Sequence, residues 1–264
     1  MKFIRIKSIA YLFLICVLMC GCDYRNYFYT ENSLKKVAEK SLEEKYGEEF
    51  VVHRVWNKSQ TMFFADCSPE DNEEVIFTAD IRKNGDGIVA DGYAQGVVAK
   101  EVDDLLKDDF KKYFGDCYTL AFITNYYNVY KFSDAKNVSI DEYMKKVDLD
   151  DVGYFVYVDK SLILDETIDE ECEFFEEVIP DMIEKKQIPD LCIKIYFTTG
   201  ELKDKCKDYY STHSDADFDL DNELDKYSNI SLIYENGKLD KVYEGSWLNE
   251  RYCEYKQFRE NINK

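Results

Sequence analysis

A run of alternating carboxylates toward the C-terminal end is the feature of this sequence closest to a metal site. Residues 214–225 read SDADFDLDNELD, so acidic side chains occupy every second position from 215 onward. Oxygen ligands at alternate positions are typical of a calcium-binding loop, and the candidate ligands are Asp215, Asp217, Asp219 and Asp221. Counted from Asp215, position six is leucine rather than glycine and position twelve is lysine rather than glutamate. We therefore expect a solvated acidic loop that binds calcium only weakly.

Six of the nine cysteines lie beyond residue 22, at Cys67, Cys117, Cys172, Cys192, Cys206 and Cys253. An even number allows disulfides in an oxidising compartment. The candidate pair is Cys67 and Cys117, because both fall in the first of two predicted modules. The alternative is that these cysteines pack in the core as small apolar side chains. No C-x-x-C spacing is present, so neither a zinc ribbon nor a thioredoxin-like pair is expected.

The two histidines do not define a catalytic site from sequence alone. His53 lies in a predicted strand, and His213 is expected to end a helix, where a cation is favoured by the helix dipole. A Cys–His nucleophile pair needs direct contact between the side chains, and nothing in the sequence argues for one. Nucleophile-elbow, phosphate-loop, dinucleotide and zinc-protease motifs are absent from the sequence. We therefore name no catalytic residue and expect no cofactor.

Composition excludes one class of partner. The chain has 264 residues, 45% of them hydrophobic and 33% charged, which fits one large or two small globular domains. Its net charge of −20 argues against nucleic acid, which needs a basic surface. The 22 tyrosines are typical of protein- or carbohydrate-binding surfaces, but tyrosine also favours strands. The strand explanation is the one that the tyrosine positions favour.

The first 22 residues carry the strongest functional signal. Lys2, Arg5 and Lys7 precede an apolar run at 9–19 that is eleven residues long. A membrane-spanning helix needs about 20 apolar residues, so this run is too short to be one. A basic start, a short apolar run and a small residue before a polar segment predict a secretory signal peptide over residues 1–21.

The end of this segment, Met19-Cys20-Gly21-Cys22, resembles the lipobox of bacterial lipoproteins. In that class a cysteine after a small residue receives a diacylglyceryl group and becomes the first residue after cleavage. Gly21 matches the small residue and Cys22 the lipidated one, whereas Met19 stands where leucine is commoner. The resemblance covers residues 1–22 only. It implies export and attachment to the outer side of the cell membrane, and it implies nothing about activity.

Charge favours a covalent lipid as the membrane anchor. Removal of residues 1–21 leaves 31 basic against 54 acidic residues, a net charge of −23. Anionic headgroups repel such a domain, so binding to lipid surfaces through charge is not expected. A single acyl chain binds a membrane only marginally and two chains bind stably, which a diacylated Cys22 satisfies.

The remaining chain predicts an α+β fold of two small modules with antiparallel or mixed sheets packed by helices. A lipidated cysteine and an aromatic tether occupy residues 22–32, and a polar boundary segment lies at 131–138. The first module, 33–133, is expected to contain a helix at 33–46, with Ser33 as its N-cap and Gly47 as its C-cap. Strands at 50–56, 61–67 and 75–81, a helix at 91–114 and a strand at 117–130 are expected to follow.

The second module, 134–252, precedes a polar tail at 253–264. Capping boxes at 139–142 and 167–170 predict two helix starts, and Pro180 is expected to kink or divide the second helix. The other predicted elements are strands at 153–159, 191–198, 229–235 and 238–243 and a helix at 201–213.

These features predict a lipid-anchored, extracytoplasmic module that binds or interacts without catalysis. Its expected partners are the membrane, through Cys22, and a protein or a carbohydrate. The alternative is a cell-surface hydrolase whose residues come together only in the fold, and which therefore leaves no local motif.

Overall fold

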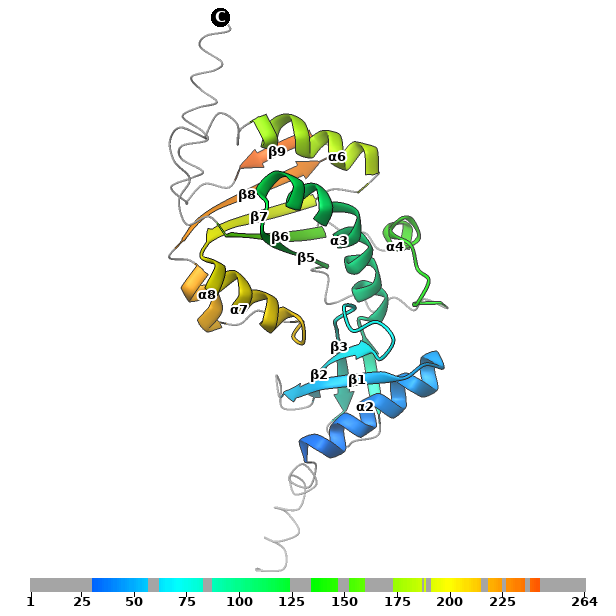
Figure 1. The fold of residues 1–264 in the computed structure, drawn as a ribbon. Coiled ribbons are helices and arrows are strands. Elements are labelled where there is room, and N and C mark those ends of the chain that lie inside the picture. Colours follow the sequence, from blue (N-terminus) through cyan, green and yellow to red (C-terminus); the bar gives the residue numbers. More distant parts are fainter. Residues whose placement is uncertain are drawn as a thin grey trace, which may run out of the picture.

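The computed structural model describes residues 30–56, 62–82, 87–123, 134–146, 152–159, 173–186, 188, 191–214, 218–224, 227–235 and 238–242 (Figure 1). The predicted signal peptide at 1–21, Cys22 and the polar tail at 253–264 therefore lie outside the described residues. Among the helices of the described ranges, none has the length and apolar character that crossing a bilayer requires.

The first half folds as one helix on a four-stranded antiparallel sheet, in the order β1-β2-β3-β4. Its elements are α2 (Glu31–Tyr46), β1 (Phe50–Trp56), β2 (Met62–Pro69), β3 (Phe77–Arg82) and β4 (Ile88–Asp91). One face of α2 is apolar at helical spacing, and Leu34, Ala38 and Leu42 are buried there. The predicted helix and the first three strands are confirmed to within two residues at each end.

The caps of α2 show why it begins and ends where it does. Thr30, rather than the predicted Ser33, is the N-cap, and its side chain accepts the backbone N–H of Ser33. Gly47 adopts a left-handed conformation with φ of 73°, and its N–H donates to the carbonyl of Glu43. This is the C-cap that the sequence predicts at Gly47.

The strand β4 is missing from the sequence prediction, which begins a helix at residue 91. In the structure α3 (Tyr93–Phe114) begins two residues later, because 88–91 pair with β3. Asp91 then accepts the N–H of Tyr93 at 3.2 Å and satisfies one of the free donors of the first turn.

The second half forms a mixed sheet in the order β5-β6-β7-β8-β9, in which only the β6–β7 pair is parallel. Its strands are β5 (Cys117–Ile123), β6 (Val152–Asp159), β7 (Leu191–Thr198), β8 (Ser228–Glu235) and β9 (Lys238–Val242). The helices of this half are α4 (Ile140–Lys146), η4 (Phe174–Val178), α6 (Ile179–Lys186), α7 (Gly200–Tyr210) and α8 (Phe218–Leu224). Helices and strands thus combine as the predicted α+β fold.

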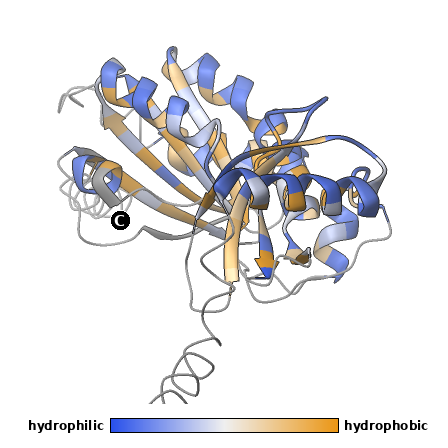
Figure 2. Cartoon of the chain, turned by 90° about the horizontal axis from the view of Figure 1, so that it is seen from below, coloured by the Kyte–Doolittle hydropathy of each residue, from blue (hydrophilic) through white to orange (hydrophobic). Residues whose placement is uncertain are grey.

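Helix α3 connects the two sheets. It packs against β3 of the first sheet and against β5 and β6 of the second (Figure 1). Val98, Val102, Leu106 and Phe110 are fully buried along it. Hydrophobic residues concentrate on the strands and on the helix faces turned toward them, while the outer helix faces are hydrophilic (Figure 2). One hydrophobic core therefore continues from one sheet to the other.

The predicted boundary at 131–138 does not separate the two sheets. β5 falls in the predicted first module but pairs with β6 over its whole length. Part of the boundary segment itself is packed, since Ala135 and Val138 are buried and Lys136 forms ion pairs with Glu48 and Asp71. The core along α3 explains this, because a strand that follows α3 directly has an apolar surface to pack on.

Pro180, predicted to kink or divide a helix, lies in the first turn of α6, which follows η4 without a break, so the helix is not divided there. The turn before Pro180 is a π-helix, η4, in which the N–H of Ile179 bonds to the carbonyl of Phe174. Proline has no N–H to donate and its ring clashes with the carbonyl four residues earlier, and the wider π turn accommodates both effects.

Candidate functional site

The alternating acidic residues at 215–225 were expected to form a loop, but part of this segment is helical. Asp215 and Asp217 lie outside the described residues, whereas Asp219 and Asp221 belong to α8. Leu220 and Leu224 of α8 are buried against the aromatic face of the second sheet, which explains why a helix forms there. Alternate residues of a helix lie about 200° apart, so the spacing that would align ligands is lost. Within the described ranges no three His, Cys, Asp or Glu side chains are placed to hold a metal ion.

The candidate disulfide between Cys67 and Cys117 is not formed. Both thiols are free, because Cys67 lies in the first sheet and Cys117, on β5, lies in the second. Burial raises the pKa of Cys117 to about 11 and that of Cys206 to about 12. These buried thiols stay protonated at neutral pH and pack as small apolar groups rather than act as nucleophiles. Cys172 and Cys253 lie outside the described residues.

A β-bulge on β1 places His53. Val52 pairs with Cys67 and Arg54 pairs with Asp66, so His53 is the extra residue between two consecutive pairs. Bulges redirect side chains in this way and are common beside functional sites. The His53 Nε2 atom lies 2.9 Å from the hydroxyl of Ser68, which is fully buried.

The surroundings of His53 favour its neutral form. Burial is the largest influence and lowers the pKa of the imidazole. The carboxylates of Asp66 and Glu73 act in the opposite direction, while His213 and Lys35 lower the pKa of His53 further. Neutral His53 is therefore the form that the folded protein stabilises.

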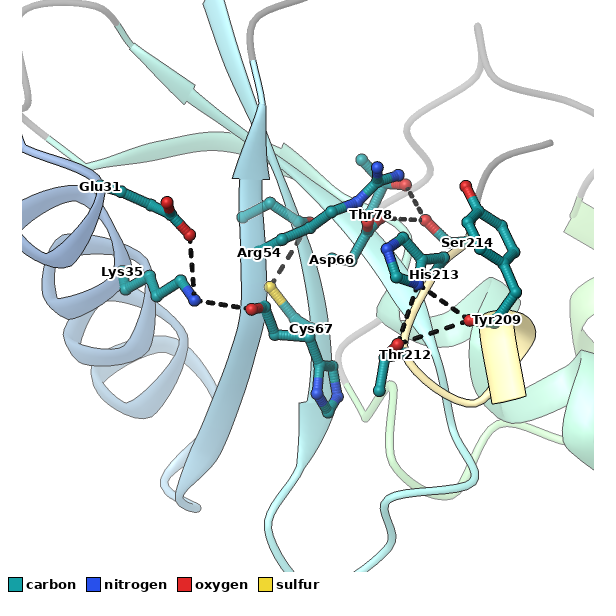
Figure 3. Close-up of polar contacts among 12 residues, drawn as sticks. Glu31, Lys35, Arg54, Asp66, Cys67, Thr78, Tyr209, Thr212, His213 and Ser214 are labelled. Atoms are coloured by element: carbon teal, nitrogen blue, oxygen red, sulfur yellow. Dashed lines mark hydrogen bonds and ion pairs between the residues drawn. The ribbon is translucent and has the colours of Figure 1, made fainter. Parts of the chain in front are cut away.

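A polar clasp joins the first sheet to the loop after α7; we define it as Arg54, Asp66, Thr78 and Ser214 (Figure 3). Asp66 is fully buried, and Arg54 Nε donates to one of its carboxylate oxygens. The Ser214 hydroxyl donates to the other oxygen at 2.6 Å. Since the single proton of Ser214 is used there, the Thr78 hydroxyl donates to Ser214, at 2.5 Å.

The face of the sheet that carries the clasp is the one opposite α2. Figure 3 shows α2 and Lys35 on one side of β1 and the Ser214 loop on the other. Arg54, Asp66 and Thr78 form one cross-strand row over β1, β2 and β3. The Arg54 guanidinium lies 5.2 Å from the centre of the Trp56 ring, which fixes it over the row.

His213 lies beside the clasp rather than at the end of a helix. α7 ends at Tyr210, and the His213 ring stacks on Tyr209 with centroids 4.1 Å apart and an interplanar angle of 14°. His213 Nδ1 is 2.9 Å from the Tyr209 carbonyl and 2.8 Å from the Thr212 hydroxyl. A carbonyl oxygen only accepts, so Nδ1 carries a proton in this arrangement.

The second sheet has an aromatic face that α7 and α8 cover only in part. Tyr118, Tyr157 and Tyr196 form one cross-strand row, and Tyr157 and Tyr196 are buried beneath the two helices. The predicted placement of many tyrosines on strands, mainly for packing, is confirmed for this row.

The neighbouring positions on this face keep part of their surface exposed; we call Leu120, Phe122, Phe155 and Lys194 the aromatic shelf. The rings of Phe122 and Phe155 are 4.5 Å apart. Gly153 makes room for them, since a Cβ atom there would lie 2.0 Å from Phe122 Cζ. The shelf therefore combines two half-exposed rings with one ammonium group.

Sequence reasoning found His53 and His213 but missed Asp66, Ser214 and the shelf. The bulge that turns His53 toward Ser68 has no signal in the sequence. A weaker signal existed for Asp66, which interrupts the apolar residues of a predicted strand.

Comparison with known proteins identifies the fold only. A DUF5037 family protein from Ruminococcus gnavus ATCC 29149 is similar over 85% of this chain and 99% of its own, with a TM-score of 0.63 and 17% identity. A DUF1672 family protein from Staphylococcus aureus subsp. aureus Mu50 covers 77% of this chain and 87% of its own, with a TM-score of 0.37 and 14% identity. No protein-family model and no curated protein matches the chain. The first likeness supports the α+β architecture and carries no information on activity.

Proposed function

We propose that this protein is a lipid-anchored, extracytoplasmic binding module that engages a protein or a carbohydrate without catalysis. The aromatic shelf is the observation that carries the binding role. The segment Met19–Cys22 and the short apolar run before it support the anchor.

The shelf has the properties of a binding surface rather than of a reaction centre. Phe122 and Phe155 offer two adjacent rings, tilted by 37° to each other, with few rotatable bonds, and such rings give contact area at a low entropy cost. Lys194 Nζ lies 4.6 Å from the centre of the Tyr196 ring, where it supplies hydrogen-bond donors at the margin of the rings. A carbohydrate ring or an aromatic side chain of a partner would fit this combination of exposed ring surface and donors.

The test is a binding screen with the full-length protein in detergent, against arrays of glycans and of peptides. Phe122→Ser and Lys194→Glu should each weaken any specific signal about tenfold or more, as truncation of a central contact does. Val89→Ser is the matched control, because Val89 is 47% exposed on the first sheet and far from the shelf in the sequence. Binding that survives both shelf variants, or that Val89→Ser abolishes equally, would contradict the assignment of the shelf.

One contact favours the competing function, a surface hydrolase. His53 Nε2 and Ser68 Oγ are within hydrogen-bond distance, as a base and a nucleophile must be. The complete burial of Ser68 opposes this role, because a substrate carbonyl has to reach the hydroxyl. A fluorophosphonate probe decides between the two: labelling of Ser68 that is lost in His53→Ala would establish the hydrolase, and an unlabelled Ser68 supports the binding module.

A further inference from the structure

Lys194 differs from the other half-buried cations of this acidic chain. It lies on β7, which pairs with β6 and with β8, so its side chain stands on the face of the second sheet rather than at an edge. In the parts of the chain that the structure describes, every other half-buried lysine or arginine forms an ion pair with a carboxylate, namely Lys35, Arg54, Lys100, Lys107 and Lys186. Among the same residues Lys194 has no carboxylate partner, and its ammonium group contacts the ring of Tyr196 instead.

The shelf places this ammonium group in line with an aromatic ring. Leu120, Phe155, Lys194 and Ser231 are directly opposite one another on β5, β6, β7 and β8, and all four are half-buried. Neighbouring strands lie about 4.8 Å apart, so an apolar group, a ring, a cation and a hydroxyl follow one another at that interval. The row fits a ligand that carries an anionic group about one strand spacing away from an apolar ring face.

The backbone of this face favours a sugar over a peptide. The strands β6 and β7 are paired on both sides, so their N–H and C=O groups are already used within the sheet. A peptide laid across them would find few partners for its own backbone, and polar groups that are buried without partners cost free energy. A pyranose ring has an apolar face that can lie on Phe155, while the hydroxyl groups at its rim stay in water.

We propose that the shelf binds an oligosaccharide in which a uronic acid residue lies on Phe155 and places its carboxylate against Lys194. This inference rests on the binding role proposed above and names the class of its ligand. The hydroxyl of Ser231, next to Lys194 in the row, is placed for a sugar hydroxyl. The carboxylates of the ligand should be separated by neutral sugars, because a chain of net charge −20 repels a polyanion.

A ligand-observed NMR titration of the full-length protein in detergent tests this inference with two pairs of probes. One pair is a short oligosaccharide of alternating glucose and glucuronate and the all-glucose oligosaccharide of the same length. The other pair has galactose and galacturonate in the same arrangement, which reverses the hydroxyl at C4. In at least one pair the acidic member should bind about tenfold more tightly, as expected for a hydrogen bond between two charged groups. Equal affinities within both pairs, or no binding of any probe, would overturn the proposal.

Variants of Lys194 assign the preference to its charge. Lys194→Met keeps an unbranched side chain without the charge and should reduce the affinity for the acidic oligosaccharide to that of the neutral one. Lys194→Arg keeps the charge and should retain the preference. Lys36→Met is the matched control, because Lys36 is exposed on α2 and its loss changes the net charge equally.

The outcomes separate this inference from the binding role itself. Glycan binding that Phe122→Ser weakens, but whose preference for the acidic probe survives in Lys194→Met, would overturn the inference and leave the binding role in place. Binding of an acidic peptide that depends on Lys194, without binding of the glycans, would replace the carbohydrate by a protein partner. A shelf that binds no glycan and no peptide would count against both proposals.

Discussion

At the scale of single residues, the clasp shows how a fully buried carboxylate is stabilised. A buried charge needs both a counter-charge and hydrogen bonds, and Asp66 receives them from Arg54 and Ser214. The two donors come from opposite halves of the fold. Ser214 therefore contributes to the stability of the whole chain as well as to the local loop.

Ser214→Ala is expected to lower the free energy of unfolding by about 1–3 kcal/mol, because it removes a hydrogen bond to a buried charged group. Denaturant unfolding measures the effect. Ser211→Ala is the matched control, since the exposed Ser211 hydroxyl donates only to the carbonyl of Asp208, and a change within about 0.5 kcal/mol is expected. Equal unfolding midpoints for the two variants would show that the clasp adds no stability.

The sequence predicted residue types better than residue partners. Both histidines are visible in the sequence, but their partners Ser68 and Tyr209 follow from a bulge and from the end of α7. A one-residue bulge depends on the pairing of β1 with β2, and a single strand sequence does not contain that register. Gly47, in contrast, acts through its own backbone conformation, and its role as a cap was predictable.

At the scale of elements, α3 carries a half-buried acid beneath the second sheet. Burial is the largest influence on Asp103 and raises its pKa, although hydrogen bonds from Thr119 and Tyr154 act against this. A carboxyl group whose pKa is raised in the folded state favours folding when protonated. Its contribution therefore falls as pH rises from the unfolded pKa through the folded one.

Asp103→Asn should accordingly flatten part of the pH dependence of stability between pH 4 and 7, and it should be neutral or stabilising at pH 7. The free energy of unfolding, measured across this range, checks the prediction. Asp108→Asn provides the comparison, because Asp108 is exposed on the same helix. If both variants showed the wild-type slope, Asp103 would not be the group responsible.

The aromatic face of the second sheet depends on one glycine. Gly153→Ala should destabilise the protein by about 1–3 kcal/mol, since its Cβ would overlap the ring of Phe122 and force it to move. Adding Phe122→Ala should recover part of this loss, and a double-mutant cycle measures the coupling. Strictly additive effects would mean that the ring moves away without cost.

At the scale of the whole molecule, the sequence predicted the fold class and most elements, but it divided the chain in the wrong place. Periodicity identifies α2, β1 and β7 from local pattern alone. It does not reveal that β5, which falls in the predicted first module, pairs with β6 of the second sheet, because strand pairing is a long-range property. The polar segment at 131–138 was predicted to be a boundary. The hydrophobic core nevertheless continues along α3, which precedes this segment, into the second sheet.

The net charge expected after removal of residues 1–21 bears directly on the proposed location. At a net charge of −23 the processed chain would gain nothing from anionic headgroups, so in the proposed location stable attachment depends on the lipid expected on Cys22. Two acyl chains contribute ~0.8 kcal/mol for each buried methylene group, which is enough to hold the protein at the membrane. Without the thiol of Cys22 no lipid can be attached and the signal peptide should not be removed.

Cys22→Ala should therefore accumulate as an unlipidated precursor that retains residues 1–21. Intact-mass analysis of the membrane fraction distinguishes this precursor from the mature form by the extra peptide and the missing lipid. Cys20→Ala is the matched control and should be processed normally, because Met19 before Cys20 is not the small residue that Gly21 provides before Cys22. Lipid of normal mass on the Cys22→Ala protein, or lipid found on Cys20, would refute Cys22 as the site of the anchor.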